Sequence, residues 1–219
     1  MDQTLVQAKA NYGYGKMGAF LGQAVTAYRP DAQQALIPAL DTRYRRAQLV
    51  AWFNPDANFR QLKPALSDKP VVYAGIDRTL LQAGDYLMDA GESTWFVGSV
   101  QALQATPCIR CNRAFTVTRA VPAIGADAYG GNAPANMTTI LTSWPGFIAA
   151  KARGVSPEER LPGDTKLNVV TISIPVTPGV EVLPNDVLVD DQADASRYSV
   201  SLAVATDWGW TIDAYYAGA

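Results

Sequence analysis

Apolar and polar residues alternate with a period of two over several segments of the chain, and this period is typical of half-buried β-strands. Residues 114–118 and 170–174 follow it, and residues 71–73 are a further short β-branched and aromatic segment. In the segment 170–174, the valine and the isoleucines face one way, while a threonine and a serine face the other. The pattern predicts a mainly β protein.

The alternation is cleanest toward the C-terminal end of the chain. Two strands are predicted there, joined by a turn at Thr206-Asp207, each with one apolar and one polar face. The predicted apolar positions are Tyr198, Val200 and Leu202 in the first strand and Trp208, Trp210, Ile212 and Ala214 in the second.

A different spacing is found at the N-terminal end, where apolar residues recur every three to five positions from residue 3 to about residue 27. This spacing predicts a helix in two pieces, with the break at Gly13 and Gly15. Arg29-Pro30 is expected to end the helix, because a residue before proline avoids the helical region. Residues 31–45 are predicted to be an extended connector.

One passage occurs twice, about a hundred residues apart. Residues 84–89 and 94–100 correspond to residues 185–190 and 197–202. The aspartates Asp85 and Asp186 are 101 positions apart, whereas the aromatic residues Trp95 and Tyr198 are 103 apart, so the second turn is two residues longer. A turn absorbs added residues while a strand pair keeps its register, so two related β-hairpins are predicted. Duplicated β-units favour a scaffold over an active site.

These patterns predict a fold class that is mainly β with an N-terminal helical segment and two small antiparallel β-barrel or meander modules. The helix and connector take residues 1–45, and the first β module takes residues 46–120. Residues 121–137 are rich in glycine and proline and too poor in large side chains to pack a core, so they are predicted to link the modules. The second module takes residues 138–219.

Composition narrows the possible partners. The 219 residues suffice for two small cores, but only 17% are charged, below the roughly 25% that is usual in soluble domains. Part of the surface is therefore expected to be buried against partners. A net charge of −2 gives no field that attracts nucleic acid or an anionic membrane. We expect no sequence-specific nucleic-acid binding.

The sequence also argues against membrane insertion, secretion and catalysis. Neither an apolar stretch of membrane-spanning length nor the start of a signal peptide is found in it. The absence of histidine removes the usual general base and the commonest metal ligand. The protein is therefore predicted not to be an enzyme, with no catalytic residue, cofactor or metal site.

Cys108 and Cys111 have the spacing of a zinc knuckle or a redox pair. A structural zinc site needs about four soft ligands, and the chain offers these two cysteines and no histidine. A redox pair lies at a helix N-terminus, whereas Cys111 leads into a predicted strand. In an extended segment the two side chains point to opposite faces, so neither a site nor a disulfide is expected.

Other candidate motifs are also predicted to be structural. Asp190, Asp191 and Asp194 lie in the second predicted turn and offer oxygen ligands for calcium, but the EF-hand spacing is absent. Aspartates in turns usually bond to their own backbone, and Asp85 and Asp186 are interpreted in the same way.

Residues 13–16 resemble a fragment of a phosphate-binding loop, yet they lack the preceding strand and the full spacing, so they are interpreted as a helix break. Strand alternation makes core or subunit packing the expected role of four aromatic residues that are also suited to stacking on bases or sugars. These residues are Trp95, Phe96, Trp208 and Trp210.

Several short motifs resemble a set of tailed-bacteriophage and prophage structural proteins. They are residues 12–16 with 28–30, residues 84–87 with 94–97, and residues 111–113, and together they span roughly residues 8 to 119. The C-terminal half, with residues 184–188 leading to 197–200, is similar to small β-barrel head-closure and head–tail joining proteins of the virion neck. Asn185 stands there in place of the usual glycine before the aspartate.

The resemblance implies a virion protein, assembled in the host bacterial cytoplasm as a homo-oligomeric ring beneath the portal. Such a ring joins the head to the tail, so its expected partners are portal or adaptor proteins on one side and tail terminator or tail tube proteins on the other. The alanine-rich N-terminal helix is expected to dock on a neighbour, and residues 121–137 to extend over the next subunit. The alternative is a tail or baseplate appendage that binds a host surface or carbohydrate, for which exposed tryptophans over a groove would be the distinguishing feature.

Overall fold

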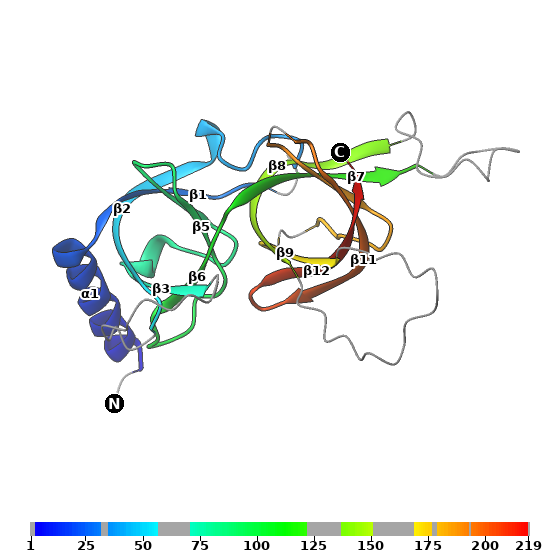
Figure 1. Cartoon of the computed structure of the whole chain (residues 1–219). Coiled ribbons are helices and arrows are strands. Elements are labelled where there is room, and N and C mark those ends of the chain that lie inside the picture. The colour runs from blue at the N-terminus through cyan, green and yellow to red at the C-terminus, as the bar shows by residue number, and fades with distance from the viewer. Residues whose placement is uncertain are drawn as a thin grey trace, which may run out of the picture.

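The computed structural model describes residues 3–31, 35–56, 71–121, 137–150, 169–176, 179–192 and 194–218. Among them are one α-helix and twelve β-strands, which form two antiparallel barrels side by side (Figure 1). The predicted fold class, mainly β with an N-terminal helix and two small antiparallel barrels, is thereby confirmed.

The first barrel closes in the ring order β1-β2-β3-β6-β5-β4, and two short 3-10 turns, η2 (Thr42–Tyr44) and η3 (Arg78–Leu80), lie in its connections. Its strands are β1 (Gln23–Tyr28), β2 (Arg45–Asn54), β3 (Val71–Gly75), β4 (Tyr86–Asp89), β5 (Thr94–Val97) and β6 (Thr106–Arg110).

The second barrel closes in the order β10-β11-β12-β9-β8-β7. Its strands are β7 (Arg113–Ala120), β8 (Met137–Ala150), β9 (Val169–Ile174), β10 (Val187–Asp190), β11 (Arg197–Thr206) and β12 (Gly209–Gly218).

The two barrels have the same topology. When each is numbered from its own first strand, both follow the ring order 1-2-3-6-5-4, with the fourth strand beside the first as in a Greek key. Therefore β1 corresponds to β7, β2 to β8, β4 to β10 and β5 to β11. The pairs between these strands are antiparallel in both barrels. Residues that pair across two strands of the first barrel can therefore be matched with residues that pair across the corresponding strands of the second.

The predicted repeat is the hairpin of the fourth and fifth strands in each barrel. Leu87 pairs with Trp95, and Leu188 pairs with Tyr198, which reproduces the offsets of 101 and 103 positions. The residues before the two aspartates, Gly84 and Asn185, both have positive φ, at 88° and 71°. Asparagine tolerates this left-handed conformation better than most residues, so it replaces glycine here without changing the turn.

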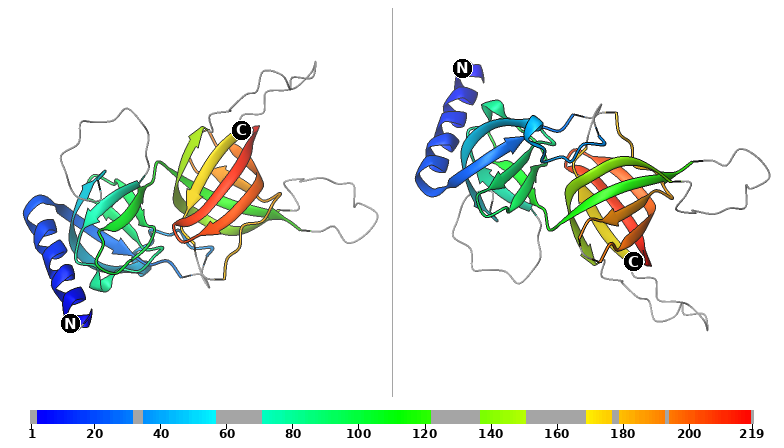
Figure 2. Two further views of the ribbon diagram at one scale, coloured as in Figure 1. Left: turned by 90° about the horizontal axis from the view of Figure 1, so that it is seen from below. Right: turned by 90° about the horizontal axis from the view of Figure 1, so that it is seen from above.

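The helix α1 (Gln3–Leu21) lies across β2 and β3, on the side of the first barrel that faces away from the second (Figures 1 and 2). The predicted break at Gly13 and Gly15 is wrong, because the helix runs unbroken through both. Glycine instead permits close packing on the barrel: a Cβ at Gly18 would lie 2.6 Å from the Gly75 carbonyl oxygen and 2.7 Å from that of Val50. The helix also ends earlier than predicted, because residues 23–28 form β1.

The predicted module boundaries are wrong at two strands. β1 was assigned to the helix and connector of residues 1–45, but it pairs with β2 and β4 of the first barrel. β7 was assigned to the first module, residues 46–120, but it pairs with β8 and β10 of the second barrel. The barrels therefore meet at residues 111–112.

The predicted linker, residues 121–137, joins two neighbouring strands of the second barrel and does not separate modules. Residues 122–136 lie outside the described residues, so the predicted contact of this segment with the next subunit stays a prediction. The second module, predicted as residues 138–219, begins at β7 and not after the linker.

The predicted strand pair at the C-terminus is confirmed, with two differences. Trp208 lies in the turn between β11 and β12 and is 37% exposed, although it was assigned to the apolar face of a strand. Leu202 is 52% exposed because the pairing of β11 with β12 shifts between Val200 and Leu202. Such a bulge reverses which residues face the core, so Ala203 packs inward and Leu202 outward.

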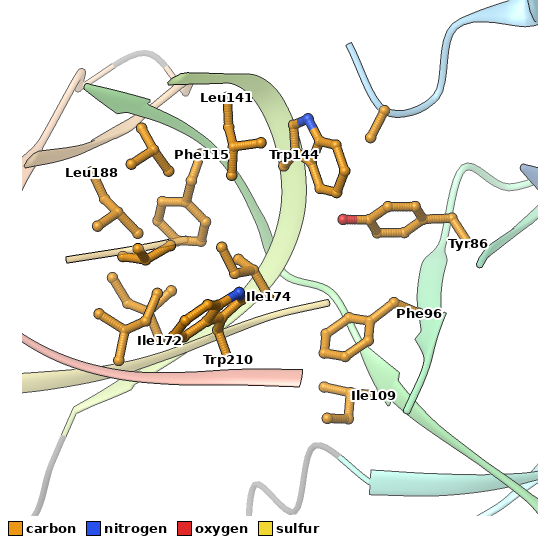
Figure 3. Packing of buried hydrophobic residues seen from close by; sticks show 14 of the residues in the cluster. Tyr86, Phe96, Ile109, Phe115, Leu141, Trp144, Ile172, Ile174, Leu188 and Trp210 are labelled. Atoms are coloured by element: carbon orange, nitrogen blue, oxygen red, sulfur yellow. The ribbon is translucent and has the colours of Figure 1, made fainter. Parts of the chain in front are cut away.

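The joint between the barrels is built from strands that are buried on both faces. From β4, β5 and β6, Leu87, Trp95 and Cys108 point into the core of the first barrel. Their neighbours Tyr86, Phe96 and Ile109 belong instead to the cluster that fills the second barrel. Figure 3 shows these three side chains reaching toward Trp144, Ile174 and Trp210.

Hydrogen bonds fix the geometry of this joint. The buried Tyr86 hydroxyl donates to the Pro145 carbonyl oxygen at 2.8 Å, and its ring packs edge-on against Trp144. The Asn112 side chain donates to and accepts from the Ile148 backbone, both at 2.9 Å. Directional bonds of this kind add specificity to the apolar contact, so the two barrels are held in one arrangement.

A strap, residues 35–41, also ties the barrels together. It belongs to the connection from β1 to β2 but lies against β8 of the second barrel. The Thr142 N–H donates to the Ala35 carbonyl oxygen, and the Ala39 N–H donates to that of Ser143. Ala39 is fully buried within the cluster of the second barrel.

Phe96→Ala is expected to destabilise both barrels together, by about 3–5 kcal/mol, because it leaves a cavity in the joint. Urea unfolding followed by tryptophan fluorescence and far-UV circular dichroism should show one transition at lower urea. Phe20→Ala is the control, since Phe20 is 86% exposed and should change stability by less than about 0.5 kcal/mol. Two separate transitions, only one of which moves, would contradict a shared core.

Candidate functional site

The structure separates the two cysteines into different packing environments. Cys108 is buried in the core of the first barrel, while Cys111 packs against the cluster of the second. Both are free thiols, and burial raises the pKa of each well above its ordinary value. Reactive cysteines have a lowered pKa, which is the opposite of the shift at Cys108 and Cys111, and the absence of a redox site at this pair stays a prediction.

The predicted turn aspartates bond to neighbouring residues. Asp190 pairs with Arg113, with 3.1 Å between its Oδ2 and the arginine Nε, and accepts from the Gln192 N–H. Asp191 accepts from the Thr116 hydroxyl at 2.8 Å. Asp194 is exposed. Among the described residues no group of three or more Cys, Asp or Glu side chains is arranged to hold a metal ion.

The aromatic residues predicted to pack are mostly buried. Trp95 stacks on Phe53 with 4.1 Å between ring centroids, and Trp210 and Phe96 lie in the joint. Trp208 lies against the first barrel, since a Cβ at Gly98 would be 3.3 Å from its indole ring. Trp95, Phe96 and Trp210 are therefore buried, whereas Trp208 is 37% exposed in the turn between β11 and β12.

An arginine–aspartate corner occurs at the head of the repeated hairpin in each barrel. In the first barrel, Arg29 donates from Nε and Nη2 to the two carboxylate oxygens of Asp85, at 2.7 and 2.8 Å. Arg29 Nη2 also donates to the Leu80 carbonyl oxygen, and Asp85 accepts from the Gln82 N–H. The corner therefore closes the connection that leads into β4.

The second barrel repeats this arrangement bond for bond. Arg119 donates from Nε and Nη2 to Asp186, both at 2.8 Å, and from Nη2 to the Glu181 carbonyl oxygen. Asp186 accepts from the Leu183 N–H at 2.8 Å. Both aspartates are almost fully buried, and these bonds raise the pKa of Arg29 and Arg119 above the ordinary value.

Sequence reasoning assigned the two aspartates to turn structure but missed both arginines. Arg29 and Arg119 are 90 positions apart, whereas the aspartates are 101 apart, so no single offset aligns both pairs. The signal that identifies them is strand register. Arg29 follows Tyr28, the partner of Tyr86, and Arg119 follows Thr118, the partner of Val187.

A third arginine fixes α1 to the first barrel. Arg78 is only 3% exposed, and within the described part of the chain it forms no ion pair. Its Nε donates to Asn11 Oδ1 at 2.8 Å, its Nη1 donates to the carbonyl oxygens of Gln101 and Gln104, and its guanidinium lies 5.6 Å from the Tyr14 ring centroid. Burial lowers the pKa of Arg78 from its ordinary value. The hydrogen bonds and the ring contact hold this side chain between helix and barrel.

The outer face of α1 is apolar and exposed. Leu5, Tyr12 and Phe20 are 55%, 68% and 86% exposed, and they lie on one side of the helix at spacings of seven and eight residues. Lys9 and Lys16 lie between them, and the helix has no acidic residue. Large apolar side chains gathered on one face mark a contact surface more often than a free one.

A groove of about 550 Å³ opens at the other end of the molecule, on the outer face of the second barrel. β7, β8, β10, β11 and β12 line it, with Thr118, Val187, Val189, Arg197 and Ser199 among the lining residues. Arg197 is its charged residue and pairs with no carboxylate among the described residues. The groove and the helix face are two open surfaces among the described residues.

Comparison with known proteins gives no family model, no curated protein and no solved structure that matches this chain. In the described part of the chain, no helix combines the length and apolar character needed to cross a membrane.

Removing either corner carboxylate is expected to destabilise the protein by similar amounts. Asp85→Ala and Asp186→Ala each take away two charge-assisted bonds and a turn bond, at an expected cost of about 1–3 kcal/mol. Arg43→Ala, which breaks the fully exposed Arg43–Asp41 pair, is the control and should leave stability unchanged. Urea unfolding measures all three, and a large effect at one corner alone would show that the corners are not equivalent.

Alkylation by iodoacetamide is expected to be at least about two orders of magnitude slower in the folded protein than in urea, because Cys108 is buried and burial raises the pKa of both thiols. An exposed thiol, with a pKa of about 8.5, reacts faster as the pH rises from 7 to 9. The raised pKa of Cys108 and Cys111 keeps the thiolate fraction of the folded protein far below that of an exposed thiol at every pH in this range, so labelling should stay slow at pH 9. Mass spectrometry of the labelled protein distinguishes these results, and fast labelling at pH 8 would contradict the burial.

Proposed function

We propose that this protein is a structural subunit of a tailed-bacteriophage virion, a neck protein that joins the portal and head to the tail as an oligomeric ring. The observation that carries the proposal is a pair of barrels joined through a shared apolar core, with the exposed apolar side chains of α1 on the first barrel and the groove on the second. A subunit that touches a neighbour on two different faces can form a closed ring. The motif resemblance gives the setting, and the geometry supports the role.

The internal joint supports a load-bearing role over a catalytic one. Tyr86, Phe96 and Trp144 fill the space between the barrels, and the Tyr86 hydroxyl bond fixes their orientation. Hinged domains are joined by small, polar interfaces, whereas this one is apolar and continuous with a core. The described residues with strongly raised pKa values, such as the two cysteines, are buried inside that structure and do not face a cleft.

The alternative, an appendage that binds host carbohydrate, receives less support. Such sites present tryptophan rings over an open groove, but Trp95 and Trp210 are 7% and 9% exposed. The open groove is lined by threonine, serine, valine, methionine, alanine and one arginine, and no aromatic residue is among its lining residues. Burial of the aromatic residues favours the connector over the binder.

Gold-labelled antibody raised to this chain should mark the head–tail junction of purified particles of the phage that encodes it. A neck ring occupies one position in each virion, so we expect one labelled spot per particle. Label at the distal tail tip would move the protein to the baseplate. Absence of both label and peptides from intact virions would refute a structural role.

A further inference from the structure

The internal joint between the barrels shows which face of a barrel of this topology is built to be covered. In the first barrel, the outward side chains of β1, β4 and β5 include Tyr28, Tyr86 and Phe96. All three belong to the cluster that fills the second barrel and its joint. This outer face is therefore an interface within the chain.

The groove lies on the corresponding face of the second barrel. Tyr28 pairs with Tyr86 and Tyr86 with Phe96, just as Thr118 pairs with Val187 and Val187 with Ser199. These three residues of the second barrel line the groove. Each is smaller than its counterpart, so the face that bulges in the first barrel is hollow in the second.

The opposite surfaces correspond as well. Pro145 of the second barrel, whose carbonyl oxygen accepts the Tyr86 hydroxyl, pairs with Ala114, as Val50 of the first barrel pairs with Ala24. Val50 is therefore the counterpart of Pro145, and its carbonyl oxygen lies against Gly18 of α1. The helix covers the surface of the first barrel that corresponds to the receiving surface of the second.

We propose that the groove of the second barrel receives the exposed face of α1 from a second copy of this chain. Within one chain, the outer face of the first barrel docks on the second barrel. In the proposed contact, the corresponding outer face of the second barrel docks on the helix-covered surface of the next subunit. Leu5, Tyr12 and Phe20 supply the large side chains that the hollow face lacks. The inference deepens the proposed function and rests on it, because it names the surfaces through which the ring assembles.

The contact joins two different surfaces, so it is heterologous and closes into a ring only if the rotation between subunits permits. Apolar burial must drive it, because Lys9 and Lys16 on the helix and Arg197 in the groove carry the same charge. Salt screens this repulsion and does not weaken apolar contact, so association should persist or strengthen in 0.5 M salt, an ionic strength on the order of three times physiological. Contact between opposite charges would weaken instead.

A mixed cross-linking experiment on the full chain tests the proposal. Lys16→Cys and Arg197→Cys place one exposed thiol on each surface and leave the helix anchors in place, while the raised pKa of Cys108 and Cys111 keeps these two thiols slow to react. With a short bismaleimide, the mixture of both variants should give a cross-linked dimer, and neither variant alone should do so. Lys16→Cys cross-linking to itself would indicate a symmetric helix contact and overturn the proposal.

A second measurement, sedimentation equilibrium up to on the order of 0.5 mM protein, follows association itself. Phe20→Glu and Ser199→Trp, which remove the helix anchor and fill the groove, should each weaken association by roughly tenfold or more. Leu36→Glu is the matched control, because Leu36 is 62% exposed but lies on neither surface, and it should leave association unchanged. Unfolding curves confirm that each variant folds.

The outcomes separate this proposal from the proposed function. Monomers at every concentration, or oligomers that neither variant affects, would overturn the helix-in-groove contact. Gold label at the head–tail junction would in that case still support the neck role, with assembly through another surface. Absence of the protein from virions would refute the neck role, even if the helix and groove were cross-linked.

Discussion

The structure depends on three short strands, β4, β5 and β6, that are apolar on both faces. An ordinary half-buried strand alternates apolar and polar residues, and its polar face meets water. Here Leu87 and Cys108 fill one barrel, while their neighbours Tyr86 and Ile109 reach into the other. Exposing the second face would leave several large side chains in water, so the first barrel requires the second. The single arrangement of the chain follows from this double burial.

The arginine–aspartate corner shows how different sequences give the same local structure. Both corners use two bonds from arginine to aspartate, one to a carbonyl oxygen five residues before the aspartate, and one from an N–H three residues before it. The requirement at the preceding position is a left-handed backbone, which Gly84 and Asn185 both meet. At the position before the aspartate, the ability to adopt a left-handed backbone therefore matters more than which residue stands there.

Sequence patterns were sufficient for the fold class and the repeated hairpin, because these depend on local alternation and spacing. They were insufficient wherever strand partners decide the outcome. The alternation within residues 113–120 predicts a strand but does not identify its partner. The predicted barrel boundary was wrong because β7 pairs with β8 and not with β6. Gly15 was interpreted as a helix break because its use, close contact of the helix with Asp77, lies in a distant segment. The groove was not predictable, since it arises from residues of five strands.

The two barrels differ most where their faces meet different surroundings. The corner that holds the fold is the same in both, but Tyr86 and Phe96 in one barrel correspond to Val187 and Ser199 in the other. An outer face of the second barrel that met only water would be expected to carry small polar residues and to need no groove. The outer face of the second barrel does not have this character. Val187 is an apolar residue that is only 9% exposed, and it lines a groove large enough for aromatic side chains. A face shaped in this way, opposite a helix that exposes Phe20, is better explained by docking than by contact with water.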